Sequence, residues 1–194
     1  MQQSEPGSAE QQRSNGLMEE VQRLKVIVQK LLVLSKADAG QLSISPESVN
    51  ISTMIESMVE DVEIIAPELR IEQDIQAGVM VPADPQLLRQ VIQNMASNAV
   101  KYNLDQGLIR FCLHKEGQTI RFQLFNSGRP IPKKERKLIF DRFYRIDKSR
   151  SNRVPGSGLG LALALEIVRA HKGCLSLDPP VDDLICFTLV LPVS

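Results

Sequence analysis

The hydrophobic pattern of this chain begins only at Leu17. Residues 1–16 carry no aliphatic side chain larger than alanine after the first methionine. They therefore bury too little surface to offset the entropy that ordering removes. We expect this segment to be a disordered tail.

From Leu17 onwards, apolar residues recur at alternating spacings of four and three. This spacing predicts an amphipathic helix over residues 17–37, with a seam suited to pairing with a second helix. The seam consists of Leu17, Val21, Leu24, Val28 and Leu31, and Met18, Ile27, Leu32 and Leu34 widen it. The pattern is too short to decide between packing on the chain's own domain and dimerisation.

Three further helices are predicted beyond residue 40. Periodic apolar residues predict a helix over 51–66, which Pro67 ends. Asp84 followed by Pro85 predicts a second start, because a capping side chain precedes a proline at the first helical position. That helix runs to residue 103, and the third follows a glycine-rich turn and ends near residue 173.

Alternating apolar and polar residues predict the strands. They lie at 69–75, 79–83, 108–116, 119–126, 174–178 and 184–193, and residues 41–45 are expected to be a short extended piece. The long strands follow one another as hairpins, so we expect one mixed, largely antiparallel sheet. With helices covering one face, the fold class is α+β, a two-layer α/β sandwich.

Composition excludes several classes of function. Lys and Arg number 23, as do Asp and Glu, so no overall field attracts nucleic acid or a membrane surface. Three widely spaced cysteines argue against a disulfide framework and against a zinc site. No apolar run reaches the roughly 18 residues that a membrane span needs. We expect a cytoplasmic chain without direct membrane contact, although a longer parent protein could carry an anchor.

The segment "NRVPGSGLGLALALEIVRAHKG", residues 152–173, places three glycines directly before a helix. Such a turn is a ready anion site, because the first N–H groups of a helix lack intrahelical partners and the helix dipole adds positive charge. The spacing is not that of a dinucleotide fingerprint, since Leu161 stands where the third glycine would be needed. A nucleotide site of another kind stays open.

Two asparagines stand out in the helix after Pro85. Asn94 and Asn98 share one face, with Lys101 and Tyr102 one turn further on. Amide oxygens are neutral, hard ligands that suit Mg²⁺, an ion usually shared with substrate phosphates. The alternative is that both amides simply face water.

Two more segments carry candidate ligand groups. "FNSGRPIP", residues 125–132, ends a strand and offers Asn126 to a ligand edge, or is only a hairpin exit. "FDRFYRIDKSRS", residues 140–151, carries cations that can reach a phosphate. We expect residues 129–155 to be a lid or, alternatively, a solvated charged loop. The cations are Arg142, Arg145, Lys148 and Arg150.

These four segments, in this order, resemble the ATP-binding domain of sensor histidine kinases, in the superfamily shared with gyrase and the mismatch-repair ATPases. "NMASNAVKYN" is similar to the N box, "NSGRPIP" to the first glycine box, "FDRFYR" to the F box and "GSGLGL" to the second glycine box. The resemblance covers residues 17–193. It implies a Bergerat-type ATP-binding fold over 41–194. It also implies that 17–40 is the second helix of an incomplete dimerisation domain, with 1–16 as a tail or interhelix loop.

The resemblance also implies roles for individual residues. Asn98 together with Asn94 would hold Mg²⁺, and Lys101 and Tyr102 would flank the ATP. Asn126, followed by Gly128, would face the adenine amino group. The phosphates would be met by Arg145 and by the backbone of Gly156, Gly158, Leu159 and Gly160.

One position indicates the type of reaction. In the ATP-hydrolysing relatives a glutamate stands where Asn94 stands and serves as general base for water, and an amide cannot accept that proton. We therefore expect phosphoryl transfer to a protein side chain. The sequence departs from the family pattern at two positions, with Asn126 for the family's aspartate and Pro130 for its second glycine. The Asn126 oxygen can still accept from adenine, but without charge the bond is weaker, so we expect lower nucleotide affinity. The alternative is a degenerate nucleotide-binding or partner-docking module.

The family's acceptor histidine lies in an H-E-x-x-x-P stretch, which this sequence does not contain. His114 lies in a predicted strand and His171 at a helix end, where a packed or capping role is expected. We expect a chain that begins between the two dimerisation helices and does not autophosphorylate. Its expected partners are the acceptor helix of the same or another kinase subunit and a response regulator receiver domain, within a homodimer of the full protein and without nucleic acid.

Overall fold

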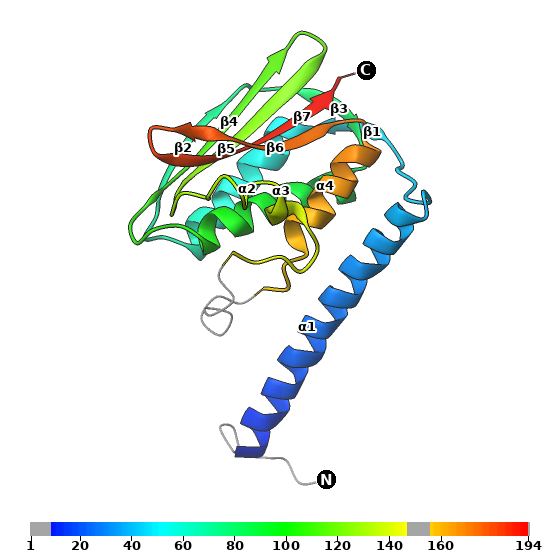
Figure 1. Ribbon diagram of the computed structural model, residues 1–194, viewed down its shortest axis with the longest axis vertical. Helices are drawn as coiled ribbons and strands as arrows, with labels where there is room; N and C mark the ends of the chain where they lie inside the picture. The colour runs from blue at the N-terminus through cyan, green and yellow to red at the C-terminus, as the bar shows by residue number, and fades with distance from the viewer. Residues whose placement is uncertain (1–8, 147–155, 194) are drawn as a thin grey trace.

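The computed structural model describes residues 9–146 and 156–193, which form a two-layer α+β structure (Figure 1). A twisted five-stranded sheet is covered on one face by the helices α2, α3 and α4, while the long helix α1 extends away from the body. The predicted fold class is confirmed.

The main sheet has the strand order β2-β4-β5-β7-β6. β2 is parallel to β4 and all other pairs are antiparallel, so the sheet is mixed as predicted. Its strands are β2 (Arg70–Ile75), β4 (Leu108–Glu116), β5 (Thr119–Ser127), β6 (Cys174–Val181) and β7 (Leu184–Pro192).

The expectation of a single sheet was wrong in one respect. β3 (Met80–Ala83) pairs with β1 (Glu47–Asn50) in a separate two-stranded sheet. The short extended piece expected at 41–45 has no regular secondary structure, and strand pairing begins only at Glu47. An extended pattern forms a strand only where a partner can pair with it, and residues 80–83 pair with 47–50.

Two of the helices begin directly after a residue whose side chain caps them. α2 (Ile51–Ile65) starts after Asn50, whose Oδ1 accepts a hydrogen bond from the Thr53 N–H. α3 (Pro85–Lys101) starts after Asp84, and α4 (Gly160–Ala170) follows the glycine turn. A short 3₁₀-helix, η1 (Leu138–Phe140), lies between β5 and α4 in the chain.

The core lies between the helices and one face of the sheet. Strand residues alternate between the two faces, so β4 and β5 turn every second side chain toward the helices. Phe111 and Phe122 stack there with ring centroids 6.4 Å apart, and neither is exposed. Burying each such side chain is worth about 1.5–3 kcal/mol.

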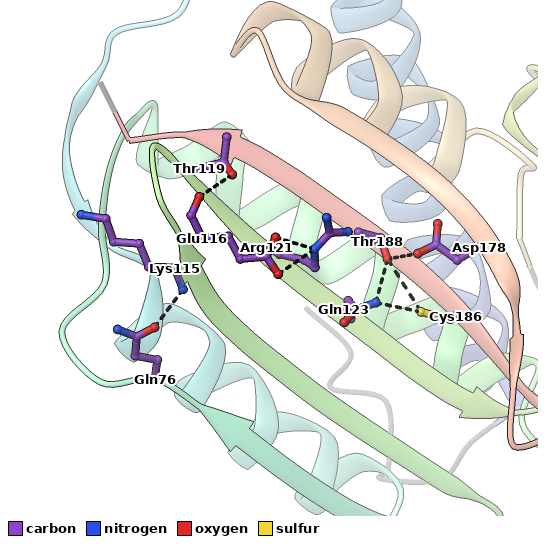
Figure 2. Close-up of polar contacts among 9 residues, drawn as sticks. All are labelled: Gln76, Lys115, Glu116, Thr119, Arg121, Gln123, Asp178, Cys186 and Thr188. Atoms are coloured by element: carbon purple, nitrogen blue, oxygen red, sulfur yellow. Dashed lines mark hydrogen bonds and ion pairs between the residues drawn. The ribbon is translucent and has the colours of Figure 1, made fainter.

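The other face of the sheet carries a set of polar contacts (Figure 2), beside a small apolar cluster of Phe125, Leu184 and Cys186. Thr188 donates a hydrogen bond of 2.6 Å to Asp178 and accepts one of 3.4 Å from Gln123. Further along β5, Arg121 pairs with Glu116. These cross-strand contacts satisfy polar groups without a covering layer, which leaves the nucleotide-binding candidates to the helical side.

Helix α1 (Ala9–Asp38) has two different apolar faces. Ile27, Val33 and Leu34 pack against the core, and Leu34 is fully buried. The five seam residues Leu17, Val21, Leu24, Val28 and Leu31 are 38–69% exposed. The seam therefore does not pack on the chain's own domain, whereas Ile27 and Leu34, expected to widen it, do.

The helix begins earlier than the apolar pattern predicted. Residues 9–16 of the predicted tail are helical, and 1–8 lie outside the described residues. Across residues 9–146 and 156–193, no helix is long and apolar enough to cross a bilayer.

Candidate functional site

Helix α3 brings Asn94 against the start of α4. The Asn94 Oδ1 atom lies 3.1 Å from the position that a Cβ of Gly160 would take. Its Nδ2 atom is buried and has no hydrogen-bond partner among the described residues. A buried donor without a partner is unfavourable by about 1–3 kcal/mol, so this amide is suited to meet an acceptor that the described residues do not supply.

Asn98 lies one turn further along α3 and is half-buried. Its backbone carbonyl accepts the Tyr102 N–H, which closes the helix. Because side chains four residues apart share a face, Asn98 continues the row that Asn94 begins.

The glycine turn requires glycine at position 158. Its φ of +69° lies in the left-handed region, which side chains disfavour. A Cβ there would also lie 2.8 Å from the backbone carbonyl carbon of Phe143, and the Phe143 N–H donates to the Gly158 carbonyl at 3.0 Å. The turn is thus held against the segment that precedes it.

The N-terminus of α4 opens onto this turn. Leu159 occupies the capping position with its side chain fully buried, and in the described part of the chain no side chain caps the first N–H groups. These N–H groups and the helix dipole favour an anion.

Cationic side chains gather at the same end. A Cβ at Gly156 would collide with the Lys101 Nζ, so the two residues are in contact. Arg145 donates from Nη1 to the Gly156 carbonyl at 3.1 Å. On α1, burial and then the charge of Lys101 lower the pKa of Lys30. The cluster carries positive charge that an anion would balance.

The opposite end of the site is built around Asn126. This side chain is only 2% exposed, faces the helical side of the sheet and donates from Nδ2 to the Ser127 carbonyl at 3.1 Å. A Cβ at Gly128 would lie 2.7 Å from Ile185 Cδ1 and 3.2 Å from the Tyr102 carbonyl oxygen. The close approach joins the end of β5 to the end of α3.

The structure therefore gathers the predicted residues into two groups. One group lies at the glycine turn and consists of Asn94, Lys101, Arg145, Gly156, Gly158, Leu159 and Gly160. The other consists of Tyr102, Asn126 and Gly128. Tyr102 also touches the first group, because the Lys101 ammonium lies 4.8 Å above its ring. The predicted cations Lys148 and Arg150 and residues 147–155 of the predicted lid lie outside the described residues.

Sequence reasoning missed three features of this site. Phe143 adopts a left-handed backbone conformation, with φ of 61°, against the glycine turn. Arg142 pairs with Asp38 of α1, and Lys30 of α1 lies near Lys101. No local pattern marks contacts between residues so far apart in the chain.

Both histidines have structural contacts. His171 is buried, accepts from the Asp84 N–H at Nε2 at 2.9 Å and donates from Nδ1 to the Ile167 carbonyl at 2.8 Å. His114 is exposed and contacts Asp74. The expected packed or capping role of His171 is confirmed.

The described residues hold no cluster of three or more His, Cys, Asp or Glu that could bind a metal. Cys112, Cys174 and Cys186 are free thiols. Asn94 and Asn98 supply amide oxygens, the kind of ligand that Mg²⁺ accepts together with water and phosphate. The Asn94 amide, whose Nδ2 has no partner among the described residues, lies beside the glycine turn, and this arrangement fits such a shared site.

Comparison with known proteins points to one family. A family model described as "Histidine kinase-, DNA gyrase B-, and HSP90-like ATPase" matches residues 83–194. The sensor protein CzcS of Cupriavidus metallidurans is 30% identical over 175 residues, which cover 90% of this chain and 37% of CzcS. The chain thus spans less than two fifths of the length of that relative.

Solved structures agree with the fold. The mycobacterial sensor histidine kinase MprB is 27% identical and superposes with a TM-score of 0.68 over 76% of this chain and 97% of that one. Full-length ShkA in complex with AMPPNP is 22% identical, with a TM-score of 0.84 over 98% of this chain and 40% of ShkA. The likeness to ShkA includes α1 and concerns the fold alone.

Proposed function

Because this chain belongs to the histidine kinase-, DNA gyrase B- and HSP90-like ATPase family, we propose that it binds Mg-ATP and donates the γ-phosphoryl group to a histidine of a dimerisation helix. Its likeness to sensor kinases identifies the domain as the ATP-binding domain of a kinase in two-component signal transduction. We propose Mg-ATP as the substrate, a histidine as the acceptor, and roles for the residues that bind the ATP.

One observation carries the proposal: the buried Nδ2 of Asn94 has no partner among the described residues and lies beside the N-terminus of α4. A phosphate oxygen would accept from this amide and from the first N–H groups of α4. The complex of ShkA with AMPPNP, an ATP analogue, supports a nucleotide as the ligand.

The cations serve the same phosphates. Lys101 and Arg145 both contact Gly156, so their charges lie at the turn that would hold the phosphate chain. Phosphoryl transfer depends on positioning and on balancing the charge of the transferred group. No carboxylate base stands at Asn94, which favours transfer to a side chain over hydrolysis.

Asn94 and Asn98 would hold Mg²⁺ through their amide oxygens. When bound, this ion neutralises charge on the phosphate oxygens. The metal would bind together with the nucleotide, because two neutral amides alone make a weak site for Mg²⁺.

Asn126, Gly128 and Tyr102 would receive the adenine. The Asn126 oxygen can accept the adenine amino group while its Nδ2 stays bonded to Ser127. Gly128 lets the end of β5 lie close to Tyr102. This close approach would fix the width of the site where it receives the adenine.

The partners follow from the same proposal. The acceptor histidine would come from a dimerisation helix of the same or a partner subunit, paired with the exposed seam of α1. The phosphoryl group would then pass to the receiver domain of a response regulator in the cytoplasm.

A thermal-shift titration tests nucleotide binding. Mg-ATP at a hundredfold excess over its Kd should stabilise the fold by about 2.7 kcal/mol. Asn98→Ala should abolish the dependence on Mg²⁺, whereas the control Gln93→Ala, an exposed amide on the same helix, should not. A folded chain that shows no shift in millimolar Mg-ATP contradicts the proposal.

A transfer assay tests the acceptor. Labelled Mg-ATP should leave this chain unlabelled, because His171 has both ring nitrogens bonded and His114 pairs with Asp74. Adding a helix that carries an H-E-x-x-x-P histidine should give acid-labile label on that histidine. Label on this chain that disappears in His171→Gln would contradict the assignment.

The second candidate function is a degenerate nucleotide-binding or partner-docking module without transfer. Asn126 in place of an acidic residue favours it, since the uncharged amide makes a weaker bond to adenine. The two assays separate the candidates, because a module of this kind would give no label on the added helix.

A further inference from the structure

We propose that helix α1 forms part of the phosphate end of the site, with Asp38 as a positioning residue that acts through Arg142. This inference rests on the proposed function, which it deepens by making ATP affinity depend on the docked position of α1.

The contact between Asp38 and Arg142 is a paired one. Arg142 donates from Nη1 to one carboxylate oxygen at 2.7 Å and from Nη2 to the other at 2.5 Å. Two parallel bonds fix the direction of the guanidinium as well as its distance. These hydrogen bonds lower the pKa of Asp38 and raise the pKa of Arg142, so both groups stay charged at neutral pH.

The position of Asp38 needs such a partner. It is the last residue of α1, where the helix dipole is negative and a carboxylate is unfavourable. The guanidinium of Arg142 offsets this charge. The end of α1 is therefore held to residue 142 by an exposed ion pair.

Residues 142–145 carry this contact to the glycine turn. Phe143 follows Arg142 directly, and its N–H donates to the Gly158 carbonyl at 3.0 Å. Arg145 donates to the Gly156 carbonyl at 3.1 Å. The left-handed conformation of Phe143 is unfavourable for a bulky residue, so it persists only because contacts on both sides hold it.

Where α1 packs on the core, it also brings a positive charge close to the phosphate end of the site. Leu34 is fully buried against the core, and Lys30 on the same side of the helix lies near Lys101. Within residues 9–146 and 156–193 neither lysine forms an ion pair, so their repulsion falls when an anion binds. By linkage, nucleotide binding and α1 docking should strengthen each other.

The test compares ATP affinity in four variants by calorimetry. Asp38→Asn and Arg142→Gln each break the pair, and we expect each to raise the Kd for Mg-ATP about three- to fivefold, the range of an exposed ion pair. The double variant should be no weaker than either single one, because both act through one contact. Glu116→Gln is the matched control, since it breaks the Arg121 pair of similar exposure on the outer face of the sheet (Figure 2).

Two further measurements distinguish a positioning role of Asp38 from a general loss of stability in the variants. Adenosine lacks phosphates, so its Kd should be the same in all variants. Without nucleotide, the Phe143 amide should exchange with deuterium faster in Asp38→Asn than in the wild type, because Arg142 no longer holds the neighbouring Phe143 N–H against the Gly158 carbonyl.

The outcomes are distinct. Equal or tighter ATP binding in Asp38→Asn overturns the inference, as does an equal loss for adenosine. If the wild-type chain binds no ATP, the proposed function is wrong, and the exchange of the Phe143 amide then still decides whether Asp38 positions this segment.

Discussion

Asn126 shows how one residue can serve both the fold and a ligand. Its side chain is buried on the helical side of β5, and its Nδ2 is bonded to the carbonyl of the next residue. The amide oxygen is the remaining acceptor, and the same amide could rotate to present its donor instead. The uncharged Asn126 side chain can therefore form a hydrogen bond either with the amino group of adenine or with the carbonyl of guanine.

Asn126→Asp should change the preference between purines. The Kd for ATP should fall about fivefold, equivalent to about 1 kcal/mol, because a charge-assisted bond is roughly twice as strong as a neutral one. GTP should bind more weakly, since a carboxylate only accepts hydrogen bonds and would face the guanine carbonyl. Calorimetry with ATP and with GTP measures the ratio of the two Kd values.

The control is Gln123→Glu, which makes the same chemical change on the outer face of β5. Without nucleotide, Asn126→Asp should also lower stability by about 1 kcal/mol, because the bond to Ser127 is lost. An unchanged ratio of ATP to GTP affinity would mean that Asn126 only shapes the turn.

His171 is a structural residue, and its replacement should affect stability alone. His171→Ala leaves the Asp84 N–H and the Ile167 carbonyl without their side-chain partner, which should lower the free energy of unfolding by about 1–3 kcal/mol. ATP affinity should not change. Denaturant unfolding and calorimetry check the two parts, with the exposed His114→Ala as the control that alters neither.

At the residue scale, the sequence predicted the local part of the site. Gly158 and Asn94 were found because a turn before a helix and the four-residue spacing of a helix are short-range patterns. Asp38 and Arg142 are 104 positions apart, so only the fold reveals their pairing. The backbone conformation of Phe143 likewise depends on the turn that it contacts.

At the scale of elements, Asp84 joins three parts of the chain. Its Oδ1 accepts from the N–H groups of Gln86 and Leu87 at the start of α3, and its Oδ2 accepts from the Ser45 N–H. Its own N–H donates to His171 at the end of α4. Burial opposes ionisation of this carboxyl, but the backbone hydrogen bonds prevail and its pKa is lowered.

The lowered pKa of Asp84 predicts a pH dependence. The ionised carboxylate stabilises the fold fully above the unfolded pKa of about 3.9, and this stability is lost as pH falls through the lower folded pKa. Asp84→Ala should lower the free energy of unfolding by about 1–2 kcal/mol at pH 7, and the difference should shrink toward pH 3.

Urea unfolding from pH 7 to pH 3 measures this difference. Asp84→Asn is the control, because asparagine still caps the helix but does not titrate in this range. A difference between wild type and Asp84→Ala that stays constant over the whole range would show that the charge of Asp84 adds nothing to the cap.

Elements with strong local signals were predicted well. The bounds of β4 match the predicted strand at 108–116, and α3 starts at the predicted Pro85. The separate pair of β1 and β3 was not predicted, because strand pairing between residues 47–50 and 80–83 depends on the whole chain. The early start of α1 at Ala9 was missed because residues 9–16 lack the apolar stripe from which the helix was predicted.

At the scale of the whole molecule, α1 presents two faces with different uses. Ile27, Val33 and Leu34 hold it to the core, whereas the seam from Leu17 to Leu31 is exposed. A row of apolar side chains that are 38–69% exposed is unfavourable in water and suits a second helix. Packing on the chain's own domain thus uses Ile27, Val33 and Leu34, and the exposed seam is left for the dimerisation that we propose.

Substitutions on the two faces of α1 should have different effects. Leu24→Glu with Val28→Glu should abolish self-association and leave the melting temperature of the monomer unchanged, because both side chains are exposed. Leu34→Ala should instead lower the free energy of unfolding by about 2–5 kcal/mol, since it opens a cavity where α1 meets the core. Sedimentation velocity over a range of concentrations, together with thermal unfolding, separates the effects. A fall in melting temperature for the seam variant as large as that for Leu34→Ala would mean that the seam packs on its own domain, and the outward face would then have no role in pairing.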